Sequence, residues 1–302
     1  MVARVATGFQ NQTSLSQLQK SNSDIATSTY QITTGYKDNR LLGYSEDAYA
    51  LLNLYDLQGN TQMYLDNITT AKNRLSATES SLQGMTDLLS EAAQLWTLGR
   101  TENSAETRAS LAPKAESLAV SYYNLFKTKF DGRYIFSGQN GGETPTTANA
   151  TATAFPGSPV PTTYYQGDSA LQTIVSGPGL TSTYGVAGNE TGLANMKAGL
   201  EALWYGLSNN DETEIDNAIS ALESAQSELA SLLGDVGGQM NSMTQLEERH
   251  NNSQVFLKEQ ADELDKVDVS EAITEFSQQQ ATLQASMMVI TQLNRLSLLD
   301  FL

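Results

Sequence analysis

Apolar side chains recur at alternating steps of three and four residues over most of this chain. That spacing is typical of one face of an α-helix packed against another helix. The longest unbroken run is Ile68, Ala71, Leu75, Thr78, Leu82, Met85, Leu89, Ala92 and Trp96. A helix that begins near residue 45 and includes this run extends over about 55 residues, or roughly 80 Å. Such lengths predict a coiled coil or a long bundle.

Weaker ladders of the same kind lie on both sides of this run. Near the N-terminus, Leu15, Leu18, Asn22, Ile25, Thr29, Ile32 and Tyr36 predict a helix over about 10–34 that ends at Gly35. After a break at 99–107, a third helix is expected around 111–125, and another helical ladder runs from 215 to 243.

The last helix is expected to begin at about residue 269. Asp268 has the position of an N-cap, and Glu271 follows three residues later with capping-box spacing. Its seam consists of Val269, Ile273, Phe276, Leu283, Met287 and Ile290 and continues into the apolar end of the chain.

The segment 140–190 interrupts the helical pattern. It holds most of the prolines, with many glycines and threonines and short β-prone pieces, and predicts a small β-rich insertion with loops. For its Pro/Thr-rich part, a disordered low-complexity linker is the alternative.

This order predicts a mainly α protein: an elongated antiparallel long-helix bundle or coiled coil, with both termini at one pole and the small β-rich insertion at the other. We expect a terminal helical assembly domain (1–44 with 266–302) and a helical rod domain (45–139 with 191–265). The third part is the insertion at 140–190.

Composition narrows the class of partner. The formal charge of −17 disfavours nucleic acid and anionic membrane surfaces. There is no cysteine, hence no disulfide or thiolate chemistry, and no run of 18 apolar residues that predicts a membrane helix. The start of the sequence lacks the pattern of a cleavable signal peptide.

Nothing in the sequence predicts an enzyme, a cofactor or a metal site. The single histidine, His250, is expected on a solvated helix face. The acids at 262–268 lack the EF-hand pattern and fit helix-end charge better. No phosphate-binding glycine loop or nucleophile elbow is present.

Five motifs carry a resemblance to the bacterial flagellin family. "QITTGYKDN" (31–39) resembles its N-terminal motif, and "SEDAYA" (45–50) resembles the acidic helix start that follows. The stretch 265–286 and the ending "LNRLSLLDFL" resemble its C-terminal motifs. "FDGRYIFSGQ" (130–139) is similar to the signature of the hook-associated protein 3 branch of this family.

This resemblance implies a structural protein of the bacterial flagellum at the hook–filament junction, on which flagellin polymerises. It implies export through the flagellar type III channel without a cleaved signal. The implied partners are other copies in a ring, hook-associated protein 1, flagellin and an export chaperone. A filament flagellin is the first alternative, and a soluble coiled-coil signalling rod is a weaker one.

The expected subunit interface lies on the terminal seams. Because these narrow seams bury little apolar surface alone, we expect the ends to order on assembly. The candidate residues are Leu15, Leu18, Ile25, Ile32, Val269, Ile273, Phe276, Leu283, Met287, Ile290, Leu293, Leu296, Leu298, Leu299 and Phe301.

Overall fold

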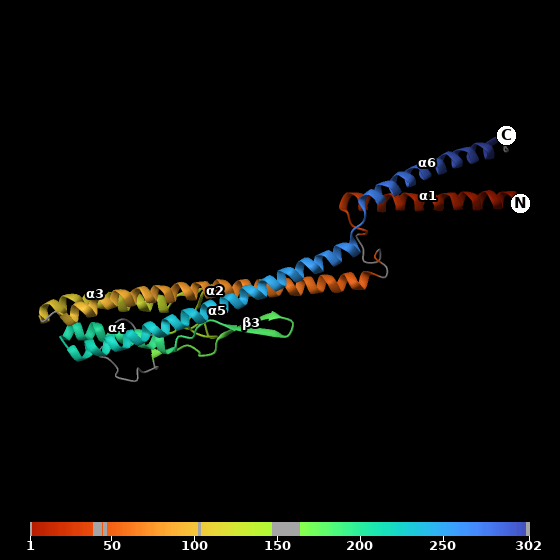
Figure 1. The fold of residues 1–302 in the computed structure, drawn as a ribbon. Helices are drawn as coiled ribbons and strands as arrows, with labels where there is room; N and C mark the ends of the chain where they lie inside the picture. Colours follow the sequence, from red (N-terminus) through yellow and green to blue (C-terminus); the bar gives the residue numbers. More distant parts are fainter. Residues whose placement is uncertain (1, 39–43, 45–46, 102–103, 147–163, 300–302) are drawn as a thin grey trace. The chain divides into compact units, whose positions relative to one another are not determined.

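The computed structural model describes residues 2–38, 44, 47–101, 104–146 and 164–299. Its helices are α1 (Val2–Thr34), α2 (Ala48–Thr101), α3 (Ala105–Phe126), α4 (Thr191–Asn209), α5 (Glu212–Asp265) and α6 (Val269–Leu299). Its strands are β1 (Lys129–Phe130), β2 (Arg133–Tyr134), β3 (Gln172–Gly177) and β4 (Leu180–Tyr184). The predicted fold class, a mainly α protein of long helices with a small β insertion, is confirmed (Figure 1).

The chain divides into two compact units. Unit 1 consists of residues 1–60 and 253–302, and unit 2 consists of residues 61–252. The long helices α2 and α5, of 54 residues each, contribute to both units. The division into terminal domain, rod and insertion stays a prediction.

The core of unit 2 is built on the long heptad ladder of α2. Ile68, Leu75 and Leu82 are completely buried, as the spacing predicts. Buried side chains of α3, α4 and α5 close around this ladder in a single hydrophobic cluster. The ladder of α2 therefore belongs to a core to which several helices contribute.

A turn at 209–211 divides the helical region after the insertion into α4 and α5, which the sequence pattern did not separate. Asn210 adopts a left-handed conformation, with φ of 54°, and ends α4. The Asp211 carboxylate then accepts hydrogen bonds from the backbone N–H groups of Thr213 and Glu214, at 3.0 and 3.3 Å, and caps α5.

The motif at 130–139 forms the β1–β2 hairpin and a packing node after it. Asp131 and Gly132 both have positive φ, which a tight two-residue hairpin turn requires. Phe136 is buried and stacks on Phe126 of α3 at 5.6 Å. At Gly138, a Cβ atom would lie 1.9 Å from the Asp168 carbonyl oxygen, so only glycine fits there.

The β3–β4 hairpin packs against the helices α2 and α5. Within unit 2, Asn67 of α2 donates to the Val175 carbonyl at 3.0 Å, and His250 of α5 lies 2.7 Å from the Ser176 carbonyl. The hairpin thus packs beside the end of the unit at which residues 61 and 252 lie. The opposite end consists of the α2–α3 and α4–α5 turns, joined by Arg108.

The expectation of a solvated His250 is wrong. Its side chain is buried, with the ring centroid 5.4 Å from that of Tyr64. The imidazole serves as a polar anchor for the hairpin. Residues 147–163, which include most of the Pro/Thr-rich part, lie outside the described residues.

Candidate assembly surface

Helices α1 and α6 form an antiparallel pair within unit 1. They lie side by side, with the start of α1 near the end of α6 (Figure 1). Their facing positions follow the predicted spacing, but apart from Ser28 and Ala272 they are only half-buried. The facing positions are Leu18, Ser21, Ile25, Ser28 and Ile32 on α1, and Ala272, Phe276, Gln279, Leu283, Ser286 and Ile290 on α6.

Both helices of the pair are tied to the connection between α5 and α6. Gly35 ends α1 with φ of 77°, and its carbonyl accepts a hydrogen bond from the Val267 N–H at 3.0 Å. The Lys37 N–H donates to the Asp265 carbonyl at 2.8 Å. Asp268 caps α6 by accepting from the Ser270 N–H at 2.8 Å, so the predicted start at residue 269 is confirmed.

A buried carboxylate anchors α2 to the same connection. Asp265 is 2% exposed, and its Oδ2 accepts a hydrogen bond from the Tyr55 hydroxyl at 2.5 Å. That hydrogen bond, with some burial, raises the pKa of Tyr55 well above its usual value. The phenol is therefore a stable donor at neutral pH, and the contact is a structural clamp.

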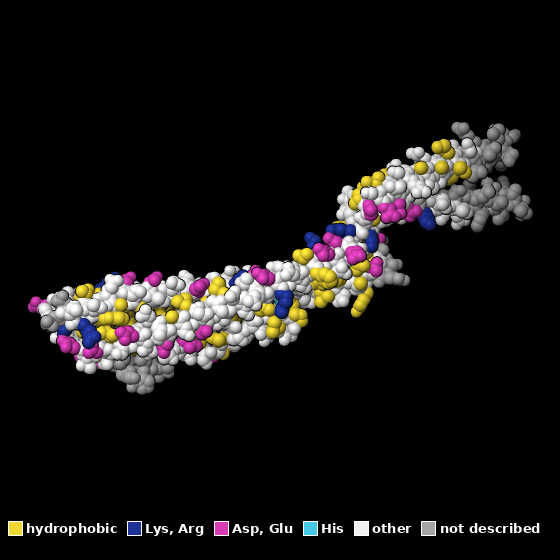
Figure 2. Space-filling model, viewed as in Figure 1, with side chains coloured by type: hydrophobic (Ala, Val, Ile, Leu, Met, Phe, Trp, Pro, Cys, Tyr) yellow, Lys and Arg dark blue, Asp and Glu magenta, His cyan; other side chains and the backbone are white. Residues whose placement is uncertain are grey.

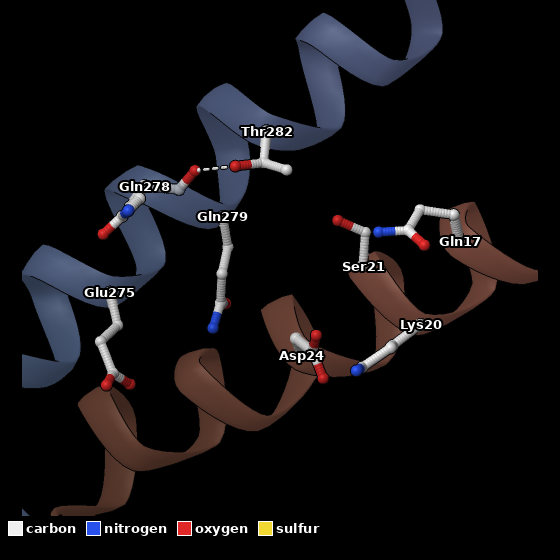
Figure 3. A pocket seen from close by; sticks show the side chains of 8 residues that line it. All are labelled: Gln17, Lys20, Ser21, Asp24, Glu275, Gln278, Gln279 and Thr282. Carbon is white, nitrogen blue, oxygen red and sulfur yellow. Dashed lines mark hydrogen bonds between the residues drawn. The ribbon is translucent and has the colours of Figure 1, made fainter. Parts of the chain in front are cut away.

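One side of the α1–α6 pair is polar. A groove of about 370 Å³ lies between the two helices, as Figure 3 shows. Lys20 and Asp24 line it from α1, and Gln279 reaches toward α1 from α6 (Figure 3). We call this side the polar edge; it is formed by Gln17, Lys20, Ser21, Asp24, Glu275, Gln278, Gln279 and Thr282.

The other side of the pair is apolar. By helical periodicity, one flank of each seam carries side chains that face away from the polar edge. These side chains are large, hydrophobic and 40–60% exposed, and they form the apolar edge: Leu15, Val269, Ile273 and Met287. Figure 2 shows charged side chains gathered between α1 and α6 and hydrophobic ones along α6.

The predicted interface residues fall into three groups. Leu18, Ile25, Ile32, Phe276, Leu283 and Ile290 are brought together in the intrachain seam. Leu15, Val269, Ile273 and Met287 lie on the apolar edge. Phe301 and the side chains of Leu293, Leu296, Leu298 and Leu299 lie outside the described residues.

Further exposed apolar residues of unit 1 were not among the predicted positions. Tyr49 and Leu52 lie on α2, Val255 and Phe256 on α5, and Met288 on α6. These residues lie off the ladders that predicted the interface. Their signal was the presence of large apolar side chains at positions that helical periodicity assigns to solvent.

The described residues carry no sign of a metal site or a membrane span. Within them, no group of three or more His, Asp or Glu side chains has the arrangement of a metal site. None of the described helices has both the length and the hydrophobicity that crossing a membrane requires.

The C-terminal part of the chain resembles a known protein family. Residues 213–302 match the family model of the bacterial flagellin C-terminal helical region. This part of the chain is flagellin-like. It comprises α5 and α6, and so includes one half of the terminal pair. No curated protein sequence matches the chain.

Solved structures share the fold of this chain. A protein from Vibrio parahaemolyticus, described as a candidate flagellar hook-associated protein, is 18% identical, with a TM-score of 0.60 over 72% of this chain and 97% of its own. Bacillus cereus FlgL is 20% identical, with a TM-score of 0.58 over 70% and 99%. Hook-associated protein 3 from Legionella pneumophila is 13% identical, with a TM-score of 0.56 over 70% and 98%. At these identities the likeness is one of fold.

Proposed function

We propose that this chain is a structural, non-catalytic subunit of the bacterial flagellum that forms the hook–filament junction. Its copies would form a ring on which flagellin polymerises, next to hook-associated protein 1. The flagellin-like C-terminal region and the fold shared with hook-associated proteins support this assignment. Export through the flagellar type III channel, with a chaperone on the C-terminal region, is part of the proposal.

The observation that carries the proposal is the apolar edge of the α1–α6 pair. Each terminal helix has one long partner in the described structure, so its seam is half-buried and its apolar flank is uncovered. Side chains such as Ile273 at 49% exposed and Met287 at 50% exposed leave apolar area in water. A neighbouring copy of the same pair offers a surface that covers this area.

Assembly by this edge would be coupled to ordering of the terminal helices. Fully burying a Leu, Ile or Phe side chain contributes roughly 1.5–3 kcal/mol. Fixing the backbone of one residue costs roughly 1–2 kcal/mol, so a single half-buried seam is a marginal source of stability. Contacts with neighbouring copies supply the remaining burial, and the ends are therefore expected to be the least stable part of the free chain.

A filament flagellin remains the second candidate because the matched family model describes flagellin itself. The two candidates differ in copy number and position along the flagellum. Electron microscopy of flagella labelled with an antibody against the β3–β4 hairpin distinguishes them. A single band at the hook–filament boundary is expected; label along the whole filament would instead support the flagellin.

Deletion of residues 293–302 tests the role of the C-terminal end. We expect flagella of this variant to lose filament attachment, while unit 2 of the purified variant keeps its thermal unfolding transition. The matched control replaces the same ten residues with a Gly/Ser sequence of equal length, which should fail in the same way. Normal filaments on the deletion variant would contradict the proposal.

A further inference from the structure

We infer that Ser28 of α1 and Gln279 of α6 set the register in which the two terminal helices pair. Ser28 is 2% exposed although it is polar, and it lies in the middle of an otherwise half-buried seam. Its hydroxyl donates a hydrogen bond to the Gln279 side-chain oxygen at 3.0 Å. This pair is the polar core of the α1–α6 contact.

The apolar members of the seam do not define one alignment by themselves. They recur at heptad spacing, so sliding α6 by seven residues brings Ile290 opposite Ile25 in place of Leu283. One aliphatic side chain then replaces another at nearly equal energy. The seam is thus degenerate in its apolar part, and the backbone hydrogen bonds of Gly35 and Lys37 with the α5–α6 connection oppose such a slip from outside the seam.

The polar pair disfavours both slipped alignments. A slip of seven residues that places Ala272 opposite Ser28 leaves the buried Ser28 hydroxyl without its hydrogen-bond partner, which is unfavourable. The opposite slip places Gly35 opposite Gln279 and Ser286 opposite Ser28, so the half-buried Gln279 amide loses its partner. A single buried polar position fixes register in coiled coils by the same physical effect.

A second pair of polar residues lies one heptad away from Ser28 and Gln279 in the native register. Seven residues toward the start of α1 and seven toward the end of α6 bring Ser21 opposite Ser286, and both are half-buried. The inferred register does not depend on the proposed function.

The absence of cysteine from the chain makes register measurable by engineered disulfides. In the full-length protein, the double variant I25C/L283C reports the native register, and I25C/F276C reports the slip of seven residues that places Ala272 opposite Ser28. We expect efficient cross-linking of the first pair and little of the second. Adding S28A and Q279L to both should raise the ratio of slipped to native cross-link on the order of tenfold.

A matched control applies the same chemical changes one helical face away. Ser23 and Gln278 are exposed, so S23A/Q278L should leave the cross-link ratio unchanged. The conservative variant S28T keeps the hydroxyl and should keep the native register. Circular dichroism checks that each variant retains its helix content.

Three results would overturn the inference. These are equal cross-linking of both reporter pairs in the parent, no cross-linking of either pair, or an unchanged ratio after S28A/Q279L. All are measured on the isolated chain, so they are independent of where the protein lies on the flagellum. If the cross-links confirm the register but the antibody labels the whole filament, this inference stands and the proposed role at the hook–filament junction is rejected.

Discussion

The ladder of α2 in unit 2 and the ladder of α6 in unit 1 have the same spacing but different surroundings. Ile68, Leu75 and Leu82 of α2 are fully buried because α3, α4 and α5 contribute to one cluster around them. The α6 positions Phe276 and Leu283 are half-buried, and among the described helices α1 is the main partner of α6. Spacing therefore specifies which face of a helix packs, and the number of neighbouring helices determines how completely that face is buried.

Truncation of a large side chain in each unit gives the largest test of this difference. Phe126 is completely buried and stacks on Phe136, so Phe126→Ala should lower the free energy of unfolding by about 3–5 kcal/mol. Ile273→Ala truncates a half-exposed side chain and should change the free energy of unfolding by less than about 0.5 kcal/mol. Urea unfolding followed by circular dichroism measures both.

The outcome for Ile273→Ala separates stability from assembly. If the apolar edge is a subunit contact, this variant should be stable but assemble poorly in flagella. A loss of stability comparable to that of Phe126→Ala would mean that the free chain already buries the edge.

A second test concerns the turns at one end of unit 2, where Arg108 is a buried cation. Its guanidinium donates to the Gly99 carbonyl at 2.9 Å, to Asn210 Oδ1 at 2.8 Å and to Glu212 Oε1 at 2.7 Å. Arg108→Met should lower the free energy of unfolding by about 1.5–3 kcal/mol, because the buried carbonyl loses its donor. The ion pair with Glu212 adds little because that carboxylate is largely exposed.

Two control variants sharpen the Arg108 test in thermal unfolding experiments. Arg108→Lys should rescue little, since an ammonium group cannot reproduce the three-way fork. Arg100→Met removes an exposed ion pair with Asp216 and should cost less than about 1 kcal/mol. Equal effects at positions 100 and 108 would show that burial of the guanidinium is unimportant.

The sequence predicted the helices better than the connections between them. The α2 ladder and the start of α6 followed from local spacing and capping, which act within a few residues. The position of the β3–β4 hairpin depends on the hydrogen bond from His250 to the Ser176 carbonyl, 74 residues away in sequence. Periodicity contains no information on such pairs, and a lone histidine among acids was assigned to solvent for that reason.

For the candidate assembly surface, the sequence identified the seam but not its sides. Ile25 and Leu283 were predicted as interface residues and lie in the seam between α1 and α6. The separation into a polar and an apolar edge depends on which flank of one helix meets which flank of the other. Ser28 and Gln279 were not predicted, because polar residues in a helix contact do not belong to a ladder of apolar side chains.

A third test uses alkaline pH to compare the buried phenols of unit 2 with an exposed one in unit 1. Burial, together with the negative charge and hydrogen bond of Glu201, raises the pKa of Tyr123. A Tyr hydroxyl whose pKa is higher in the folded than in the unfolded chain stabilises the fold fully below the unfolded pKa of about 10. This stability is lost as the pH rises toward the pKa of the folded state. The free energy of unfolding should therefore fall above about pH 10, by up to roughly 1.4 kcal/mol per pH unit for each such group.

Comparison of two Tyr→Phe variants isolates this contribution. Tyr123→Phe should reduce the slope of unfolding free energy against pH above pH 10, measured by urea titrations at several pH values. Tyr49→Phe, at an exposed position of α2, should leave the slope as in the parent. Identical slopes for all three proteins would contradict a buried, protonated Tyr123.

The smallest effect is a local one, the oxidation of methionine by hydrogen peroxide. Exposed thioethers become sulfoxides, with water as the by-product, and buried ones are protected. Met287 and Met288 of α6 are 50% and 64% exposed, whereas Met85 and Met196 of unit 2 are completely buried. Tandem mass spectrometry should find the α6 sites oxidised several-fold faster. In assembled flagella, Met287 should become protected, because it lies on the apolar edge; equal oxidation of Met287 in free and assembled protein would exclude this edge as the subunit contact.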